Sequence, residues 1–326
     1  MIEICLTQAD LVQVRFAHSP AREMVASLRL LRDPGRHPMY QTWFADVADR
    51  LRGLKLDVLT TVTALHAPPA FLTPTPVAPW GVLADELEAI AATPPALVRA
   101  QLEDGCRGRT VPAILRALYE DPAAELRSLV DEVGRYWQAA LEPWWQRLQA
   151  LCMADVSYRL EQFATAGLAR VLDGLHTAVH FTPDRILVAH PNSGPKRLDL
   201  DGSGILLVPC AFGWPTLTVS PAAGQPSLIY PPRGLAELWQ RPALGQDDPL
   251  FALLGRTRAM LLTSLGLPTT TTQLARDLDM SAAAVSQHLK VLKACGLAAA
   301  HRRGRTVLYQ RTPAATALLA TTGSMG

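Results

Sequence analysis

The spacing of apolar residues divides the chain into three stretches of different texture. Up to about residue 176 the apolar positions mostly follow the helical period, with breaks at prolines and glycines. From 178 to 232 they alternate or form short runs, which is typical of strands. From 250 onwards the helical period returns, followed by two short strand-like runs. The pattern predicts an α+β protein: an N-terminal mixed helical and antiparallel-sheet domain, then a small C-terminal unit.

The first eighty residues are expected to contain a strand and two helices. Residues 10–16 alternate between apolar and polar side chains, which predicts a strand. Ser19 and Pro20 then provide an N-cap and a first helical position, and a second helix begins near Pro38. The apolar side of that second helix consists of Trp43, Phe44, Val47, Leu51 and Leu54. Residues 66–80 are too rich in proline for a helix or a central strand, so they form either a lid or a rigid surface connection.

The stretch from 81 to 176 is predicted to be mainly helical, and the next stretch to be a sheet. The helices break where turn-forming residues stand, at 93–95, 105–108 and 121–122. The strand-like runs are 186–190, 197–200, 204–210, 216–220 and 227–232. Turns at Asn192–Gly194 and Asp201–Gly204 favour successive hairpins of an antiparallel sheet. A short helix and a polar linker at 233–248 lead into the C-terminal unit.

One helix of the C-terminal unit is specified more closely than any other. Within 281–297, SAAAVSQHLKVLKACGL, Ser281 is a favourable N-cap and Gly296 stands where a left-handed residue ends a helix. These signals predict a helix from about 282 to 294. Its buried stripe repeats at i, i+4 and i+7 and consists of Val285, Leu289 and Leu292.

The flanks of this helix indicate a helix-turn-helix with a wing. Upstream, residues 269–280 form a capped helix whose inward residues are Leu274, Ala275 and Leu278. Downstream, residues 297–312 form two short strands around Arg303-Gly304, with arginines at the tip of the hairpin. A basic hairpin beside a recognition helix is the arrangement that contacts with phosphates or the minor groove require.

The candidate DNA contacts lie on the outward side of the recognition helix and in the wing. Small residues near the helix N-terminus allow a close approach to the groove. Gln287 can pair with an adenine edge, while Ser286 and Lys290 can reach bases or phosphates. The full set is Ser281, Ala283, Ala284, Ser286, Gln287, His288, Lys290, Arg302, Arg303 and Arg305.

The charge of the chain is distributed unevenly in a way that supports this interpretation. Residues 250–326 contain nine Arg and Lys against two Asp, a net charge of +7. The whole chain carries only +2, so residues 1–249 carry −5. The small C-terminal unit is therefore the expected partner of a polyanion. We place the domain boundary at 248, with domains at 1–248 and 249–326.

Residues 250–312 resemble the winged helix-turn-helix of ArsR/SmtB-type bacterial transcriptional regulators. The matching segments are Leu253–Leu265, Leu274–Ala275, Val285–Leu289, Gly296–Leu297 and Gly304–Tyr309. The resemblance implies a homodimer that presents two recognition helices to a palindromic, double-stranded operator. His288 matches a position that is commonly His in the family, where it either orients the helix near the DNA backbone or is structural. The N-terminal layout is similar to that of large actinobacterial ArsR-type regulators with an uncharacterised extra domain.

The candidate metal ligands argue against metal sensing. Metal-sensing members of the family hold the ion through cysteines on the second helix of the domain, but Thr269–Met280 contains neither Cys nor His. His176 and His180 have the spacing that puts two imidazoles on one helix face, yet they lack the Glu of a zinc-protease helix. Five scattered cysteines with no CxxC are expected to be reduced thiols. We therefore predict no metal site and no cofactor.

The N-terminal region is expected to sense an effector in the cytoplasm. The chain shows no signal peptide and no apolar run of membrane-spanning length, which predicts a cytoplasmic protein that is nucleoid-associated when bound to its operator. A region far larger than dimerisation demands suggests a site for a non-metal small molecule or a partner. The candidate pocket residues are Trp137, Trp144, Trp145, Phe212 and Trp214, although aromatics at this spacing also suit a plain core.

Three classes of function are compatible with these patterns. The leading hypothesis is a DNA-binding regulator, a repressor whose operator affinity changes with an effector at the N-terminal domain. The alternatives are an enzyme with a DNA-binding appendage, and a winged helix used for protein interaction. GxSxG, HExxH and glycine-rich nucleotide-loop motifs are all absent from the sequence, which favours a protein that is not an enzyme. The basic wing disfavours the protein-interaction alternative.

Overall fold

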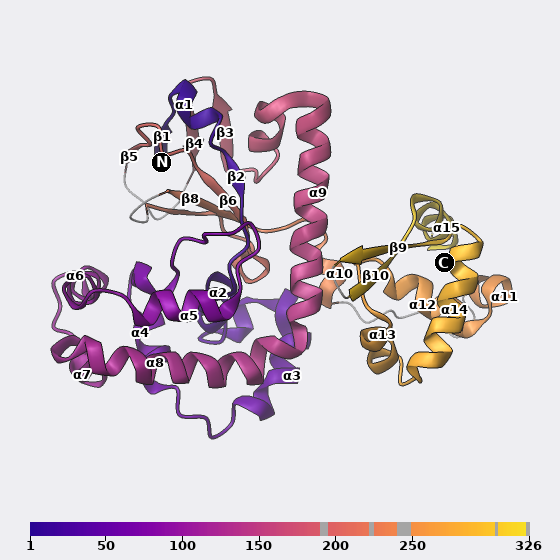
Figure 1. The fold of residues 1–326 in the computed structure, drawn as a ribbon, viewed down its shortest axis with the longest axis horizontal. Helices are drawn as coiled ribbons and strands as arrows, with labels where there is room; N and C mark the ends of the chain where they lie inside the picture. Colours follow the sequence, from indigo (N-terminus) through magenta and orange to yellow (C-terminus); the bar gives the residue numbers. More distant parts are fainter. Residues whose placement is uncertain (190–194, 222–224, 240–248, 304–305, 324–326) are drawn as a thin grey trace. The chain divides into compact units, whose positions relative to one another are not determined.

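A computed structural model describes residues 1–189, 195–221, 225–239, 249–303 and 306–323 (Figure 1). The chain divides into two compact units. One contains residues 1–145 and 155–233, and the other contains residues 146–154 and 234–326. Helices and mixed sheets together make the protein α+β, as the apolar pattern predicts. No helix within the described residues is long and apolar enough to cross a bilayer.

Helices dominate the first 173 residues, and the three breaks that the sequence predicted after residue 81 are confirmed. Helix α5 ends before the prolines at 94 and 95, α6 ends at Cys106, and α8 starts at Pro122. The helices are α1 (Gln8–Leu11), α2 (Pro20–Leu30), α3 (Gln41–Leu51), α4 (Asp57–Thr63), α5 (Leu83–Ala91), α6 (Pro95–Cys106), α7 (Arg116–Glu120), α8 (Pro122–Tyr136) and α9 (Glu142–Asp173). Short 3₁₀ turns are η1 (Pro34–Arg36), η2 (Pro38–Tyr40), η3 (Ala70–Leu72), η4 (Ala113–Leu115) and η6 (Ala211–Gly213).

Side-chain caps explain why these helices start where they do. The Ser19 hydroxyl accepts a hydrogen bond from the Arg22 amide (3.1 Å), and Pro20 occupies the first turn of α2. The Asp121 carboxylate likewise accepts from the Ala124 amide (3.2 Å) at the start of α8. Each bond satisfies one of the amides that a helix N-terminus leaves unpaired.

The junction between α8 and α9 is a π-turn, η5 (Trp137–Leu141). Pro143 stands in the first turn of α9 and has no amide hydrogen to donate to the preceding turn, so the backbone there widens instead of continuing the α-helical ladder. A second irregularity lies at Gly167, whose φ of 77° interrupts α9. Neither irregularity was among the helix breaks that the sequence predicted.

Two four-stranded mixed sheets replace the single antiparallel meander that the sequence suggested. One has the order β3-β4-β1-β5 and the other the order β2-β6-β8-β7. Their strands are β1 (Ile2–Cys5), β2 (Arg15–Phe16), β3 (Val179–Thr182), β4 (Arg185–Val188), β5 (Lys196–Asp199), β6 (Leu206–Pro209), β7 (Thr218–Ser220) and β8 (Ser227–Tyr230). The prediction of successive hairpins was wrong, because β1 pairs with β5, and β6 with both β2 and β8, in parallel.

Local hydrogen bonding also corrects the strand predicted at 10–16. Thr7 and Asp10 form a capping box, in which the Asp10 amide donates to the Thr7 hydroxyl (3.3 Å) and the Thr7 amide donates to the Asp10 carboxylate (2.8 Å). This box starts α1 and leaves only Arg15 and Phe16 in a strand. The turn Asp201–Gly204 connects strands of different sheets and is not a hairpin, while Asn192–Gly194 lies outside the described residues.

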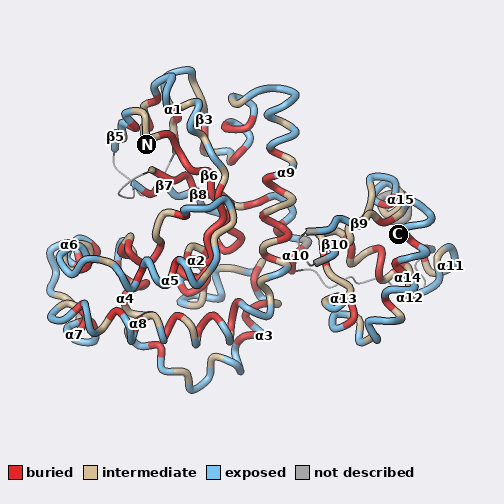
Figure 2. The backbone as a smooth tube through the Cα atoms, in the orientation of Figure 1, coloured by how far each residue is buried: buried red, intermediate tan, exposed pale blue. Residues whose placement is uncertain are grey.

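The core of this unit lies around the two sheets. Strands β6 and β8 are buried along their whole length, which Figure 2 shows as continuous red segments. Parallel strands covered on both faces are expected to be apolar throughout, and the sequences LLVP and SLIY fit that rule with one serine. Leu228 and Ile4 are fully buried in this core.

The histidine pair is not on a helix face. His176 lies in the loop before β3, and His180 lies in β3 itself, so their four-residue spacing has no helical meaning. The His176 ring accepts from the Ala178 amide (3.0 Å), and the His180 ring is 3.7 Å from Asp173. The sequence interpretation was wrong here because α9 ends at Asp173, just before the pair.

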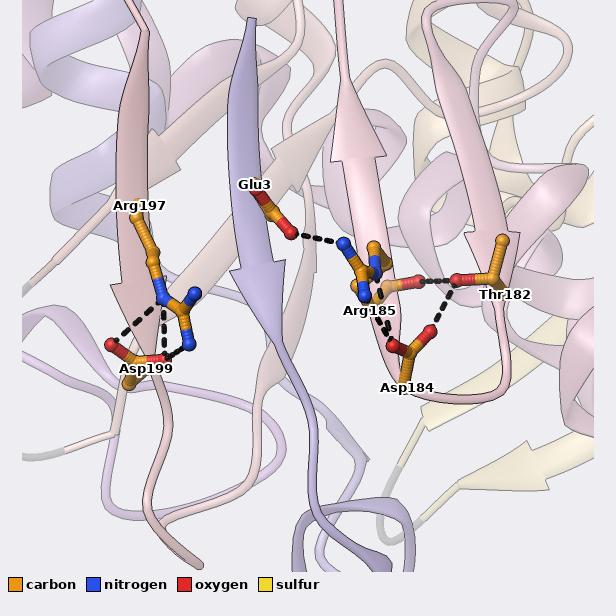
Figure 3. Close-up of polar contacts among 6 residues, drawn as sticks. All are labelled: Glu3, Thr182, Asp184, Arg185, Arg197 and Asp199. Atoms are coloured by element: carbon orange, nitrogen blue, oxygen red, sulfur yellow. Dashed lines mark hydrogen bonds and ion pairs between the residues drawn. The ribbon is translucent and has the colours of Figure 1, made fainter.

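The solvent-facing side of the first sheet carries a network of charged residues (Figure 3). Arg185 of β4 donates to Glu3 of β1 and to Asp184, and this hydrogen bond from Arg185 lowers the pKa of Asp184 to about 2. On the edge strand, Arg197 donates to Asp199 over 3.1 Å. Exposed ion pairs of this kind contribute little to stability. Because every charged residue of the network is paired within it, we do not treat the network as a binding site.

The second unit contains the predicted winged-helix elements. They are α10 (Leu235–Trp239), α11 (Pro249–Leu254), α12 (Arg256–Ser264), α13 (Thr271–Asp277), α14 (Ala282–Ala294), β9 (Ala298–Arg303), β10 (Thr306–Arg311) and α15 (Pro313–Gly323). The expected single helix over Leu253–Leu265 is instead divided at Gly255, whose φ is 76°. The hydrophobic core of the second unit includes Leu262 and Leu265. From α13 and α14 it includes Leu274, Ala275, Val285, Leu289 and Leu292.

Candidate nucleic-acid interface

Helices α13 and α14 form the helix-turn-helix of the second unit. The Thr270 hydroxyl caps α13 by accepting from the Gln273 amide (3.1 Å), and the Ser281 hydroxyl caps α14 by accepting from the Ala284 amide (3.2 Å). Between them, Asp279 adopts the left-handed conformation (φ 52°), which Asp tolerates better than most residues. The turn is therefore set by two polar caps and one left-handed residue.

The end of α14 is fixed by a Schellman motif. Gly296 has a φ of 69°, its amide donates to the Lys293 carbonyl (3.0 Å), and the Leu297 amide donates to the Leu292 carbonyl (2.9 Å). A residue with a side chain would be strained at Gly296, which is why the sequence could predict this end. The observed helix, Ala282–Ala294, confirms the predicted one.

The two faces of α14 divide as the apolar stripe predicts. Val285, Leu289 and Leu292 are buried. Ser281, Ala283, Ser286, Gln287 and Lys290 are exposed, whereas Ala284 and His288 are half-buried. The exposed residues of the helix body lie three or four positions apart, so they form one continuous surface. The half-buried position of His288 leaves open whether it orients the helix or only packs.

The wing is the two-stranded sheet of β9 and β10. Its antiparallel register runs from Ala298 opposite Arg311 to Arg303 opposite Thr306. Arg302 is exposed on β9. Gly304 and Arg305, and with them the predicted tip, lie outside the described residues, so the roles of Arg303 and Arg305 stay predictions.

Backbone pairing ties the wing to the helix-turn-helix. The Thr269 amide donates to the Tyr309 carbonyl (2.9 Å), and the Tyr309 amide donates back to Thr269 (2.8 Å). The Arg311 amide donates to the Leu265 carbonyl (2.9 Å). These bonds hold β10 beside the segment that leads into α13, so the wing and the recognition helix keep a defined spacing.

Two exposed cations of this unit were missed as candidate contacts. Lys293 follows Lys290 by three positions on α14, and Arg276 lies on α13. Both are exposed, and both had entered the sequence analysis only through the net charge of +7. The spacing of Lys293 from Lys290 was the signal that could have identified it.

The aromatic residues predicted to line an effector pocket lie in the first unit in two groups. Trp137 and Trp145 meet edge to face with centroids 4.7 Å apart, and the Trp144 indole donates to Asp46 (2.8 Å). Phe212 packs against Trp43, with centroids 4.6 Å apart. Trp214, the fifth residue of the predicted set, is half-buried. Their role as a pocket stays a prediction.

A buried polar cluster beside these aromatics was not expected from the sequence. Glu23 of α2 is fully buried and accepts from the Ala211 amide (2.7 Å), the Phe212 amide (3.0 Å) and the Cys210 thiol (3.3 Å). Burial and the neighbouring Glu23 charge raise the pKa of the Cys210 thiol well above its ordinary value. Nothing local marks Glu23 as buried, because its hydrogen-bond donors lie almost two hundred residues away in the sequence.

Comparison with known families separates the same two regions of the chain. Residues 257–300 match the family described as "Bacterial regulatory protein, arsR family", and residues 96–234 match a family of unknown function, DUF5937. No curated protein and no solved structure matches the chain significantly. The protein has the organisation of a large ArsR-type regulator with an uncharacterised N-terminal region, and its C-terminal module is that of a DNA-binding transcriptional regulator.

Proposed function

We propose that this chain, whose residues 257–300 form an ArsR-family regulatory module, is a repressor that binds double-stranded operator DNA with α14 in the major groove. The observation that carries the proposal is the exposed surface of α14, where Ser286, Gln287 and Lys290 stand free of the core stripe. The net charge of +7 in residues 250–326 supplies the attraction to phosphates. In this proposal α14 reads bases while the wing holds the backbone.

A homodimer is part of this proposal. Helix α11 and helix α15 flank the module at its two ends in sequence and contact each other. Leu253 of α11 is 63% exposed, which offers an apolar side chain to a second copy. Two copies related by a twofold axis would present two recognition helices to a palindromic site. We place the protein in the cytoplasm, on the nucleoid when it is bound.

The N-terminal region, residues 1–248, is proposed to sense a non-metal small molecule or partner. It is about three times the length of the DNA-binding module, and it contains all seven tryptophans of the chain. The aromatic groups around Trp145 and Phe212 provide the apolar surfaces that a planar or apolar effector requires. The metal-free prediction is retained for the winged helix, whose helix α13 carries no Cys or His.

Gel-shift titration on the promoter of the gene's own operon tests the DNA-binding proposal. Full-length protein should shift this fragment more tightly than a shuffled fragment of equal length, and replacing Lys290 by Ala should weaken the shift. Arg52→Ala is the matched control, since Arg52 is an exposed cation on α3's end that pairs with Asp49 in the other unit. Equal affinity for both fragments, or equal loss with both variants, would contradict sequence-specific binding through α14.

A further inference from the structure

A proline-rich strap and α5 are joined to the start of α2 by backbone hydrogen bonds and by a buried carboxyl group. The strap is residues 73–81, TPTPVAPWG, all but the last of which fall within the segment 66–80 that the sequence left open between a lid and a rigid connection. The His18 amide donates to the Pro79 carbonyl (2.9 Å), and the Gly81 amide donates to the His18 carbonyl (2.9 Å). Prolines at 74, 76 and 79 have no amide hydrogen, so the strap has little capacity for further backbone bonds.

A buried carboxyl group adds to the attachment. Glu86, in the first turn of α5, accepts from the Ala21 amide at the N-terminus of α2 through Oε2 (2.6 Å). Its other oxygen, Oε1, is buried and has no hydrogen-bond partner among the described residues. An added Cβ at Gly81 would lie 2.8 Å from the His18 carbonyl oxygen and 2.9 Å from Glu86 Oε1, so strap, carboxyl and His18 are in close contact.

The strap covers the ring of His18, a second buried polar group. Within the part of the chain that the structure describes, neither ring nitrogen of His18 has a hydrogen-bond partner, and the residue is fully buried. It stacks on Trp145 with centroids 5.0 Å apart and tilts against Trp80 of the strap at 6.0 Å. Its Nε2 lies 3.6 Å from Glu23. Withdrawal of the strap would therefore expose a polar ring set between aromatic side chains.

We propose that Glu86 is a proton-controlled latch, which keeps α5 docked on α2 and the strap closed over His18 while its carboxyl is protonated, and releases both when the proton is lost. A neutral carboxyl still accepts from the Ala21 amide, and it removes the unpaired negative charge from the buried Oε1. An ionised carboxyl gains solvation only by leaving this position. The latch acts within residues 1–145 and does not depend on DNA binding.

The ionisation of Glu86 gives the direction of the switch. Burial raises the pKa of Glu86 from 4.5 to about 7, against the opposing effects of the Ala21 amide, the Ser19 hydroxyl and the Arg22 guanidinium, while Asp85 adds to the rise. Because the closed state binds the proton more tightly than an open state would, closure is strongest below pH 4.5 and weakens as the pH rises towards 7. Lowering the pH from 8 to 6 should therefore favour the closed state by about tenfold.

Two other charged groups near Glu86, on α2 and α8, have hydrogen-bond partners of their own. Arg22 donates to the Ser220 hydroxyl (2.9 Å), which holds its guanidinium on the side of β7. Helix α8 also packs against α5, and its buried carboxyl, Glu132, accepts from the Leu59 amide (2.8 Å). The charge of Arg22 favours the ionised form of Glu86 and so opposes the effect of burial. The carboxyl of Glu86 is the group whose replacement tests the latch.

Hydrogen exchange of the full-length protein tests this proposal. Protection of peptides covering 73–86, corrected for the intrinsic pH dependence of exchange, should fall by about tenfold from pH 6 to pH 8 in the wild type. Glu86→Gln, which mimics the neutral carboxyl, should keep its protection within about twofold over this range. Glu88→Gln, at an exposed position of the same helix, should behave as the wild type.

Two outcomes would overturn the latch. A flat protection profile in the wild type would show that no proton controls the strap, and this measurement needs no variant to fold. The same fall in Glu86→Gln as in the wild type would assign the pH dependence to another group, such as His18. Both results are read from the N-terminal region alone, so they leave the DNA-binding proposal unaffected.

Discussion

The Thr312 hydroxyl donates a hydrogen bond to the Gly296 carbonyl (2.7 Å), which joins the start of α15 to the residue that ends α14. The same hydroxyl accepts from the Ala315 amide in the first turn of α15 (3.3 Å), and the Thr312 amide donates to the Leu297 carbonyl (3.1 Å). One side chain therefore ties the end of the recognition helix to the helix that follows the wing.

Replacing Thr312 by Val should destabilise the winged-helix unit by about 1–2 kcal/mol, because the cap of α15 and the bond to Gly296 are lost together. Urea unfolding, followed by circular dichroism, measures the change. Thr312→Ser retains the hydroxyl and should lose much less stability. Equal losses for Val and Ser would show that the methyl group, and not the hydrogen bonds, is what matters.

Gln287→Ala should weaken binding to the preferred operator by about 1–3 kcal/mol and leave binding to random DNA almost unchanged, because a base-edge contact acts only on the matching site. Gln287 is exposed on α14, two positions after the buried Val285. Its side chain is therefore on the outward side of the helix, where a base could be reached. Fluorescence anisotropy on paired specific and random duplexes measures both affinities. A uniform loss on the two duplexes would remove Gln287 from the base-reading set.

The double variant Arg303→Ala, Arg305→Ala should weaken binding to all DNA sequences alike. If both side chains contact phosphates, the plot of log affinity against log salt should become shallower by about two units, since each phosphate contact contributes about 0.9. A matched control removes two exposed cations at the C-terminal end of α3, Arg50 and the capping residue Arg52, and should keep the wild-type slope. An unchanged slope in the wing variant would contradict the wing assignment.

The parts of the structure that the sequence predicts well are those determined by neighbours in the chain. Both ends of helix α14 were predicted correctly, because the cap at Ser281, the stripe of buried apolar residues and the glycine after the helix are all local signals. The fold class followed from the same periodicities. The residues proposed to contact DNA could therefore be assigned to the outward face of this helix from the sequence, and their contact with DNA stays a prediction.

The sheet topology could not be predicted, because it depends on pairs that are distant in sequence. Ile2 pairs with Val188 on one side and with Lys196 on the other, and nothing in residues 2–5 specifies these partners. The short runs after 178 were consistent with a hairpin series, and only tertiary packing selects the parallel arrangement. The buried position of Glu23 was hidden for the same reason, since its donors are in the loop after β6.

Glu23→Gln should destabilise the N-terminal unit by about 1–3 kcal/mol. The carboxylate accepts from the amides of Ala211 and Phe212 through separate oxygens, and a glutamine would present its NH₂ group to one of these donors. Thermal unfolding at constant pH measures the loss. Glu88→Gln, an exposed substitution of the same type, should leave the midpoint unchanged. Equal midpoints for both variants would mean that the carboxylate is not needed to hold α2 against this loop.

The final prediction concerns an effector of the N-terminal region. A ligand can release the operator only if it binds the free and DNA-bound conformations with different affinity, and a coupling of about 1–3 kcal/mol changes operator affinity roughly 5- to 150-fold. A compound that relieves repression should also change tryptophan fluorescence, because Trp137 and Trp145 are in contact within the aromatic group proposed for binding. Trp145→Phe should reduce both responses, whereas Trp239→Phe, outside that group, should retain them. A relieving compound that leaves the fluorescence unchanged, or that acts equally on both variants, would place the sensing site elsewhere in the chain.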